Sequence, residues 1–154
     1  MTFYAWTMLV ESVRLRLLLI GPLRLVLGAV WLGAARAVGG SGTGALVTFT
    51  AGAFAMAFLV SNDPRARFRQ APSEPEALPA DARVAPAWRH AVHAAFPSTI
   101  GVSVLAAVTL AFNPTLTALL GGILAGLGVA ALLWTYTVDG RLYVDPRTGS
   151  VFRK

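Results

Sequence analysis

Cysteine is absent from this chain of 154 residues, and charged residues are scarce, at 13% of the sequence. The lack of cysteine excludes disulfides, thiolate metal sites and cysteine nucleophiles. Ordinary soluble domains carry about 25% charged residues, whereas this chain is 56% hydrophobic with a mean hydropathy of +0.65. These deficits favour a membrane protein over a soluble domain.

The longest uncharged stretch runs from Ala91 to Trp134 and contains no Asp, Glu, Lys or Arg. A single helix over this range would be about 66 Å long, roughly twice the thickness of a bilayer's hydrocarbon core. Asn113-Pro114 stands in the middle, and the residue before a proline avoids helical geometry. The stretch therefore predicts two spanning helices joined by a short turn, with a kink at Pro97 in the first of them.

A second pair of apolar segments, about 22–39 and 45–61, flanks the glycine-rich turn 39–44. Together the two pairs predict an all-α membrane protein with four transmembrane helices in two helical hairpins. The tail alternates apolar and polar residues around Asp145-Pro146, which is typical of a short C-terminal β-hairpin. The expected segments are an interfacial amphipathic helix at 1–21, a first transmembrane hairpin at 22–61, a cytoplasmic proline-rich loop at 62–86, a second transmembrane hairpin at 87–137 and a cytoplasmic tail hairpin at 138–154.

Residues 2–20 carry apolar side chains at alternating spacings of three and four, with Glu11, Arg14 and Arg16 mostly on the other side. This pattern is typical of an amphipathic helix that lies in the membrane interface. Gly21-Pro22 indicates a helix break, because proline fits the first turn of a new helix. The alternative is that residues 2–20 form the first part of a longer first spanning helix.

The thirteen basic residues lie almost entirely between the apolar segments, so membrane topology explains them better than a nucleic-acid partner does. With four spans, one side of the membrane receives twelve of the thirteen and the other receives Arg36 alone. The positive-inside rule then predicts that both termini and the central loop are cytoplasmic. A composition rich in Ala, Arg and Gly suggests a bacterium and hence its inner membrane. The arginines expected to contact lipid headgroups are Arg14, Arg16, Arg24, Arg65, Arg67 and Arg69.

Small residues recur every four positions in the last predicted helix, at Ala118, Gly122, Gly126 and Ala130. Such a stripe lets another helix backbone approach closely in lipid, so we expect it to be a helix-packing surface, within one chain or between subunits. Gly128 lies about 200° around the helix axis from Gly126 and is expected to lie off this contact. Weaker sets of small residues occur in the first two predicted helices, at Ala29, Gly33 and Ala37 and at Ala51 and Ala55.

Groups suited to chemistry are sparse in this sequence. His90 and His93 share a helical face, but the remaining ligands of a metal site are missing, so neither a metal nor a cofactor is expected. The second and fourth predicted helices contain no carboxylate, histidine, lysine or arginine, and we expect no catalytic residues. One set of polar residues toward the outer side would either line an anion-attracting vestibule or bond back to its own helices, namely Arg36, Thr43, Thr48 and Thr50.

The function favoured by these patterns is that of a non-enzymatic integral membrane protein that acts through helix–helix association, as an accessory subunit or a small oligomer. Its expected partners are the lipid bilayer and either further copies of the chain or a larger membrane complex. The alternative is a small oligomeric channel or transporter with a polar outer vestibule. A membrane enzyme is disfavoured, because the sequence offers no set of acid, base or metal-binding residues.

Overall fold

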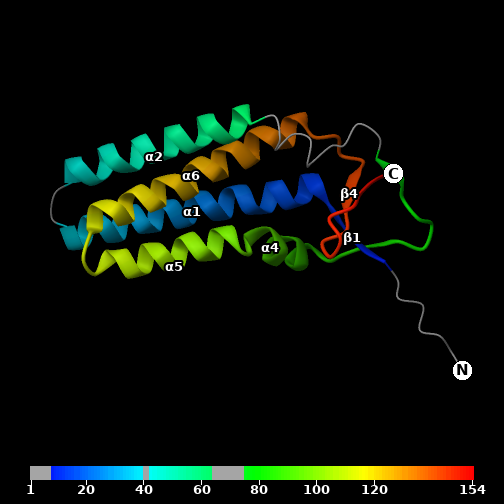
Figure 1. Ribbon diagram of the computed structural model, residues 1–154, viewed down its shortest axis with the longest axis horizontal. Helices are drawn as coiled ribbons and strands as arrows, with labels where there is room; N and C mark the ends of the chain where they lie inside the picture. Colours follow the sequence, from blue (N-terminus) through cyan, green and yellow to red (C-terminus); the bar gives the residue numbers. More distant parts are fainter. Residues whose placement is uncertain (1–7, 40–41, 64–74) are drawn as a thin grey trace, which may run out of the picture.

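A computed structural model describes residues 8–39, 42–63 and 75–154, and shows a bundle of helices with a small sheet at one end (Figure 1). The helices are α1 (Val13–Gly39), α2 (Gly42–Asn62), α4 (Ala87–Ala95), α5 (Ser98–Leu110) and α6 (Pro114–Thr137). The strands are β1 (Leu9–Ser12), β2 (Glu76–Ala77), β3 (Arg83–Val84), β4 (Leu142–Val144) and β5 (Val151–Arg153). The prediction of a mostly helical chain with several long apolar helices is confirmed, with a larger sheet than expected.

Three of these helices, α1, α2 and α6, are long and apolar enough to cross a membrane. Helix α5 alone has 13 residues, or about 20 Å at the standard rise, which is short of a bilayer core. Helices α4 and α5 can together form a fourth span that is bent by 55°. The bend lies at the predicted kink, where Pro97 interrupts the helix because it has no N–H to donate.

The expected helix break at Gly21-Pro22 is absent, because α1 runs without interruption from Val13 to Gly39 with Pro22 inside it. Packing explains why the helix continues. A Cβ atom added at Gly21 would lie 2.7 Å from the Leu132 side chain and 3.2 Å from the carbonyl oxygen of Gly128 on α6. This close packing against α6, next to the proline, favours a continuous helix in spite of the one helical hydrogen bond that proline removes.

A separate interfacial helix over residues 1–21 is therefore wrong for the described part of that range. Leu9–Ser12 form a strand, and the following residues belong to α1. The apolar period of this segment is real, but its buried members Val13, Leu17 and Ile20 pack against Ala131 and Leu142 of the same chain. An amphipathic pattern shows that one face of a helix is buried, but it does not show whether protein or lipid covers that face. Residues 1–7 lie outside the described residues.

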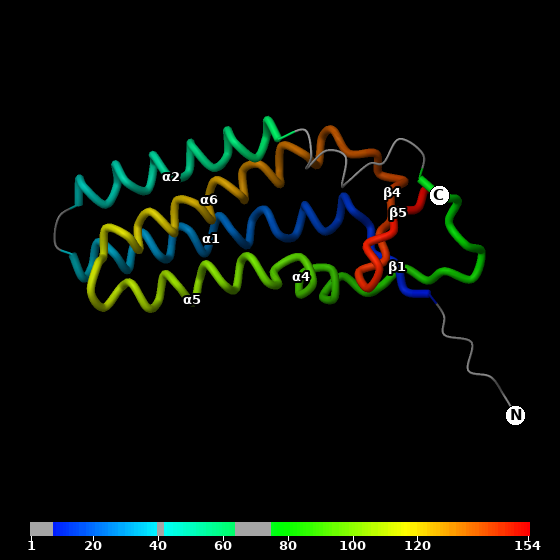
Figure 2. The backbone as a smooth tube through the Cα atoms, viewed as in Figure 1, coloured from blue at the N-terminus to red at the C-terminus, as the bar shows by residue number. Residues whose placement is uncertain are grey.

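Helix α6 lies between α1 and α2 and is the central helix of the bundle (Figure 2). In its most apolar window 61% of the residues are buried, against 17% for α1 and 11% for α2. Glycine makes the close approach of α1 possible, since a Cβ at Gly28 would lie 2.6 Å from the carbonyl oxygen of Gly121. Helix α6 is capped at its start, because the side chain of Asn113 accepts a hydrogen bond from the backbone N–H of Leu116.

The sheet joins three distant parts of the chain in the strand order β2-β5-β4-β1-β3. Strand β1 is antiparallel to β4 and parallel to β3, while β2 is parallel to β5. The predicted tail hairpin is present as the antiparallel pair β4 and β5. A lone hairpin is marginal in water, and here the N-terminal strand and the central loop stabilise it by pairing with both of its edges.

The turn of this hairpin is held by Asp145, whose side chain is 7% exposed. It accepts hydrogen bonds from the backbone N–H of Arg147 and the hydroxyl of Thr148. Burial alone would raise the pKa of this carboxyl group, but these hydrogen bonds and the positive charge of Arg147 lower the pKa below its usual value. Gly149 has a φ of 76°, the left-handed region that glycine adopts without strain.

Candidate functional site

A cluster of ionisable side chains lies where the sheet joins the helices. Glu11, at the end of β1, is fully buried. Its Oε1 atom lies 2.5 Å from Nδ1 of His93 on α4, and its Oε2 atom lies 3.5 Å from Nε of Arg16 on α1. The contact to Arg16 is an ion pair at that distance without the geometry of a hydrogen bond. We call Glu11, Arg16, His90 and His93 the junction cluster.

His90 is the second buried member of the junction cluster, with 0% exposure. Its Nε2 atom accepts a hydrogen bond from the backbone N–H of Ser12 at 3.0 Å. Its Nδ1 atom lies 3.0 Å from the carbonyl oxygen of Pro86 and must donate there, because a carbonyl oxygen only accepts. These two bonds assign a neutral imidazole with the proton on Nδ1. Both ring nitrogens are engaged, so neither is open to a metal ion.

The bonding pattern gives the junction cluster a structural task, which is to fasten β1 to the start of α1 and to α4. The hydroxyl of Ser12 accepts a hydrogen bond from the backbone N–H of Leu15 and so caps α1. His93 contacts the buried carboxylate of Glu11 through one nitrogen, and its side chain is 37% exposed. Among the described residues, no group of three or more His, Asp or Glu side chains converges as a metal site would require.

The sequence placed Glu11 on the polar side of an interfacial helix and identified no partner for His90 and His93, so it missed this cluster. Glu11 and His93 are 82 positions apart, and no short motif links residues at such a distance. The available signal was chemical. Glu11 is the only acid before the central loop, and an acid between apolar residues needs a partner when it is buried.

Arg24 is tied to the bend between α4 and α5. Its Nε atom donates to the Thr99 hydroxyl at 2.8 Å, and its Nη2 atom donates to the Ser98 hydroxyl at 3.0 Å. Of the arginines expected at lipid headgroups, Arg14 is exposed and Arg16 pairs with Glu11. The other three of that set, Arg65, Arg67 and Arg69, lie outside the described residues.

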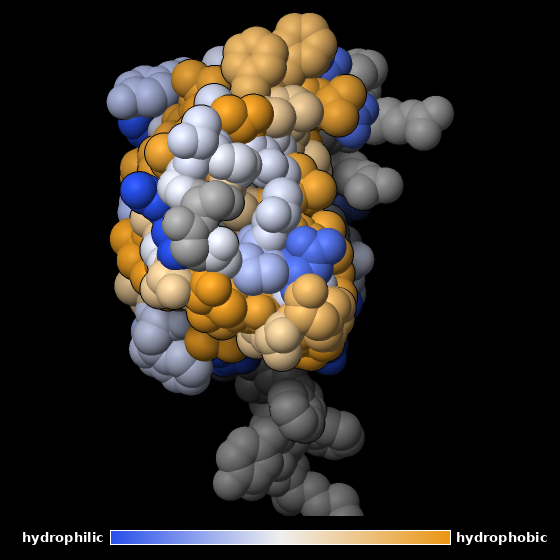
Figure 3. All heavy atoms as spheres, turned by 90° about the vertical axis from the view of Figure 1, so that its left-hand side faces the viewer, coloured by the Kyte–Doolittle hydropathy of each residue, from blue (hydrophilic) through white to orange (hydrophobic). Residues whose placement is uncertain are grey.

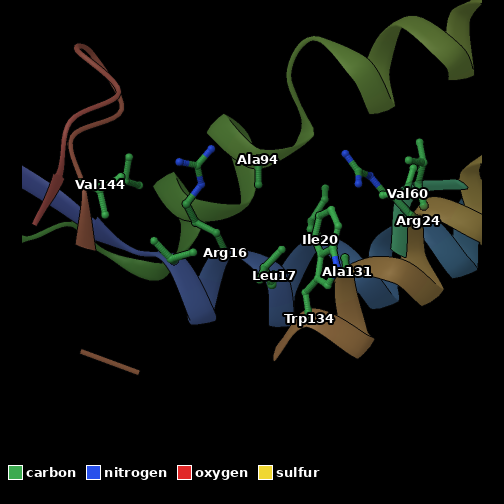
Figure 4. Close-up of a pocket in the computed structure, with 12 residues that line it drawn as sticks. Arg16, Leu17, Ile20, Arg24, Val60, Ala94, Ala131, Trp134 and Val144 are labelled. Carbon is green, nitrogen blue, oxygen red and sulfur yellow. The ribbon is translucent and has the colours of Figure 1, made fainter. Parts of the chain in front are cut away.

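A pocket of about 300 Å³ lies beside the junction cluster, between α1, α4, α6 and the tail hairpin. Figure 4 shows that Arg16 and Arg24 extend from α1 toward α4, on either side of Ala94. The other walls are mostly apolar and include Ile20, Ala131 and Trp134. Val60, close to the end of α2, also lines the pocket. The pocket therefore lies at the level where the long apolar helices give way to the polar sheet.

The small-residue stripe of α6 contacts α2 within the same chain. A Cβ added at Gly122 would clash with the carbonyl oxygen of Phe49, and one at Gly126 would clash with that of Ala53. Ala118 and Ala130 are both completely buried. The stripe is thus used inside the bundle and is not available to a second subunit.

Gly128 was expected to lie off the packing surface, and this expectation is wrong. A Cβ at Gly128 would lie 2.7 Å from the carbonyl oxygen of Gly21 and 3.1 Å from the Leu25 side chain. Helix α6 is contacted on two faces, by α2 on one and by α1 on the other, so a position about half a turn away from the stripe is buried as well. A single stripe in the sequence could not show a helix with two neighbours.

The weaker set on α1 has the opposite surroundings. Ala29, Gly33 and Ala37 are all exposed. A Cβ atom added at Gly33 would meet no other atom within 4 Å. Val26 and Val30 flank the set and are 61% and 55% exposed. This face of α1 is accordingly free of neighbours among the described residues.

The polar residues expected on the outer side lie at the end of the bundle opposite the sheet, which Figure 3 shows as a less hydrophobic area surrounded by hydrophobic side chains. Arg36 is exposed and lies next to Gly42, at the start of α2. Thr43 is exposed, and the Thr48 hydroxyl donates to the carbonyl oxygen of Gly44 in its own helix at 2.8 Å. Thr50 lies in a shallow apolar groove on the outside of α2. Of the two alternatives for these residues, Thr48 therefore shows the second, a hydrogen bond back to its own helix.

Three features remain as candidates for function, namely the junction cluster, the pocket beside it and the free face of α1. The first two combine buried charge with an apolar cavity, and the third is a surface that a second helix can approach closely. None of the three depends on a short sequence motif. Comparison of the chain with protein-family models, with curated proteins and with solved structures gives no match.

Proposed function

We propose that this chain is a non-enzymatic integral membrane protein that acts by association with further membrane helices, as a small homo-oligomer or as an accessory subunit. The observation that carries the proposal is the free face of α1 formed by Ala29, Gly33 and Ala37, which are all exposed. Lipid tails are as apolar as leucine, so helices in a bilayer associate where small residues let their backbones approach. The α6 stripe already serves this purpose inside the bundle, and the α1 set is the equivalent surface that still lacks a partner helix.

The sheet supports a four-span topology. Strand β1 precedes α1, strands β2 and β3 follow α2, and strands β4 and β5 follow α6, yet all five form one sheet. The chain must therefore return to the same side of the membrane after α1 and α2, and again after α4, α5 and α6. This return supports α4 and α5 together as one bent span. The excess of basic residues on the sheet side supports a cytoplasmic location for that side and for both termini in the proposed bacterial inner membrane.

The polar groups that resemble catalytic residues are occupied, which supports a non-enzymatic role. Both nitrogens of His90 and the hydroxyl of Ser12 hold backbone groups in place. The Glu11 carboxylate is buried between two cationic or hydrogen-bonding partners. A general base needs a free site within reach of its substrate, and the contacts of these three residues satisfy the fold instead.

Substitution of Gly33 by Ile tests the association surface. The added side chain meets open space within one chain, so the folded monomer keeps its thermal stability, while a close helix–helix contact at this face is blocked. We expect Gly33→Ile to dissociate the oligomer, or to release the partner subunit, as measured by native mass spectrometry and by single-molecule photobleaching in lipid nanodiscs.

Gly101→Ile on α5 is the matched control, because a Cβ at Gly101 also meets no atom within 4 Å. It makes the same change on another exposed helix and should leave the assembly intact. A wild-type chain that stays monomeric and without a partner in native membranes would contradict the proposal. Equal dissociation by Gly33→Ile and Gly101→Ile would assign the effect to hydrophobic bulk and reject the α1 surface.

A further inference from the structure

We propose that the pocket between α1, α4 and α6 binds the phosphate group of an anionic phospholipid from the cytoplasmic leaflet, with Arg24 as the counter-ion. The inference rests on the membrane location in the proposed function but not on association between chains. It differs from general attraction of surface arginines to lipid, because it assigns one lipid to one defined cavity.

The first observation is an uncompensated charge. Arg24 donates to the hydroxyl groups of Ser98 and Thr99, which are neutral. No carboxylate in the described part of the chain lies within 4 Å of Arg24. Arg16, the other cation of the pocket, already has Glu11 as its partner. A partly buried guanidinium without an acid is stabilised by an anion from outside, and a guanidinium matches the oxygens of a phosphate well.

The second observation is the indole of Trp134, which lines the same pocket as Arg24. Its Nε1–H is shielded from the pocket as well as from solvent, so the ring offers an apolar wall to an acyl chain and no donor to the phosphate. Tryptophan is enriched at the depth of the lipid headgroups, where one end of its ring is wet and the other is apolar.

The third observation is the position and shape of the pocket. Val60 near the end of α2 and Val144 of the tail hairpin both line it, so it lies at the depth of the headgroups when α2 crosses the bilayer. Its volume of about 300 Å³ is at the lower end for ligand pockets. That space accommodates a phosphate and the first part of an acyl chain against Ile20 and Ala131. The remainder of the lipid would lie along the apolar outside of the helices.

Lipid titrations of the purified chain in a neutral detergent test this proposal. We expect phosphatidylglycerol to raise the thermal unfolding temperature and to remain bound, one per chain, in native mass spectra. Phosphatidylcholine, which has no net charge, should have a clearly smaller effect. Arg24→Gln should weaken phosphatidylglycerol binding by about tenfold or more, since a charge-assisted hydrogen bond is worth at least that factor. Arg141→Gln, which removes an exposed arginine near the sheet, should leave binding unchanged.

Each contrary result has a defined meaning. Equal binding of phosphatidylcholine, or unchanged phosphatidylglycerol binding by Arg24→Gln, would overturn the proposal. Equal stabilisation by inorganic phosphate alone would reject a lipid as the source of the anion. If Arg24→Gln does not fold, Ala94→Phe fills the pocket while the arginine itself is kept, and retained lipid binding in that variant would overturn the assignment. All of these measurements use the single chain in detergent, so a failure of association through Gly33 leaves them unaffected.

Discussion

Adding one methyl group at Gly126 should destabilise the bundle, although alanine is the better helix former. The Cβ atom of Gly126→Ala would clash with the carbonyl oxygen of Ala53 and lie 2.9 Å from Cβ of Met56 and 3.0 Å from the backbone nitrogen of Ala57. Two of these neighbours are backbone atoms of α2, which cannot move aside as a flexible side chain would. Helix α2 must then shift away from α6 along this contact.

The magnitude follows from two opposing effects. Overpacking in a close contact costs up to about 3 kcal/mol, and the change from glycine to alanine within a helix returns about 1 kcal/mol. We expect Gly126→Ala to lower the free energy of unfolding by about 2 kcal/mol. Gly101→Ala adds its methyl group to open space on α5 and should raise the free energy of unfolding by up to about 1 kcal/mol.

Unfolding in mixed micelles, driven by sodium dodecyl sulfate and followed by circular dichroism, measures both variants against the wild type. The two variants are expected to change the free energy of unfolding in opposite directions. Both replace glycine by alanine within a helix, so helix propensity cannot account for the difference. If Gly126→Ala stabilises the protein as Gly101→Ala does, the close approach of α2 and α6 at this residue is refuted.

Two further predictions concern the junction cluster and the topology. Glu11→Gln should lower the free energy of unfolding by about 1–3 kcal/mol, because it leaves the Arg16 guanidinium next to a buried neutral group. Asp139→Asn, which weakens an exposed ion pair with Arg153, should have a clearly smaller effect in the same assay, and equal losses would contradict a structural role for Glu11. The chain has no cysteine, so single cysteines can be introduced at Asn113 and at Asp81 and treated from the outside with a membrane-impermeant maleimide. We expect the cysteine at Asn113 to react and the cysteine at Asp81 to stay unlabelled. Labelling at Asp81 from the outside would rule out the four-span topology.

The features that the sequence predicted are those set by neighbours along the chain. Asn113-Pro114 ends the preceding helix, and this is a local property of the proline ring. Pro97 interrupts its helix because it lacks a donor, and the Asp145-Pro146 turn closes its hairpin through hydrogen bonds within a few residues. Each of these signals acts over one or two turns of chain, so one sequence suffices to find it.

The features that the sequence missed depend on contacts between distant segments. Gly21-Pro22 has the local signature of a helix break, but its contact with Leu132 of α6 keeps the helix continuous. Leu9–Ser12 become a strand because β4 and β3 provide partners for them. The pairing of Glu11 with His93 is likewise invisible until α4 is placed beside β1. Tertiary packing decides all three, and it overrides local propensity.

The placement of β1 within the sheet has a consequence for biosynthesis. This strand is synthesised before all the described helices, yet its antiparallel partner β4 is synthesised only after α6. Until then the edge of β1 that faces β4 has no partner strand, although β3, on the other edge, has already been synthesised. The sheet can close only after β4 and β5 have been synthesised, so the pairing of β1 with β4 comes late in folding. A chain truncated after α6 would leave that edge of β1 open to pairing with strands of other proteins.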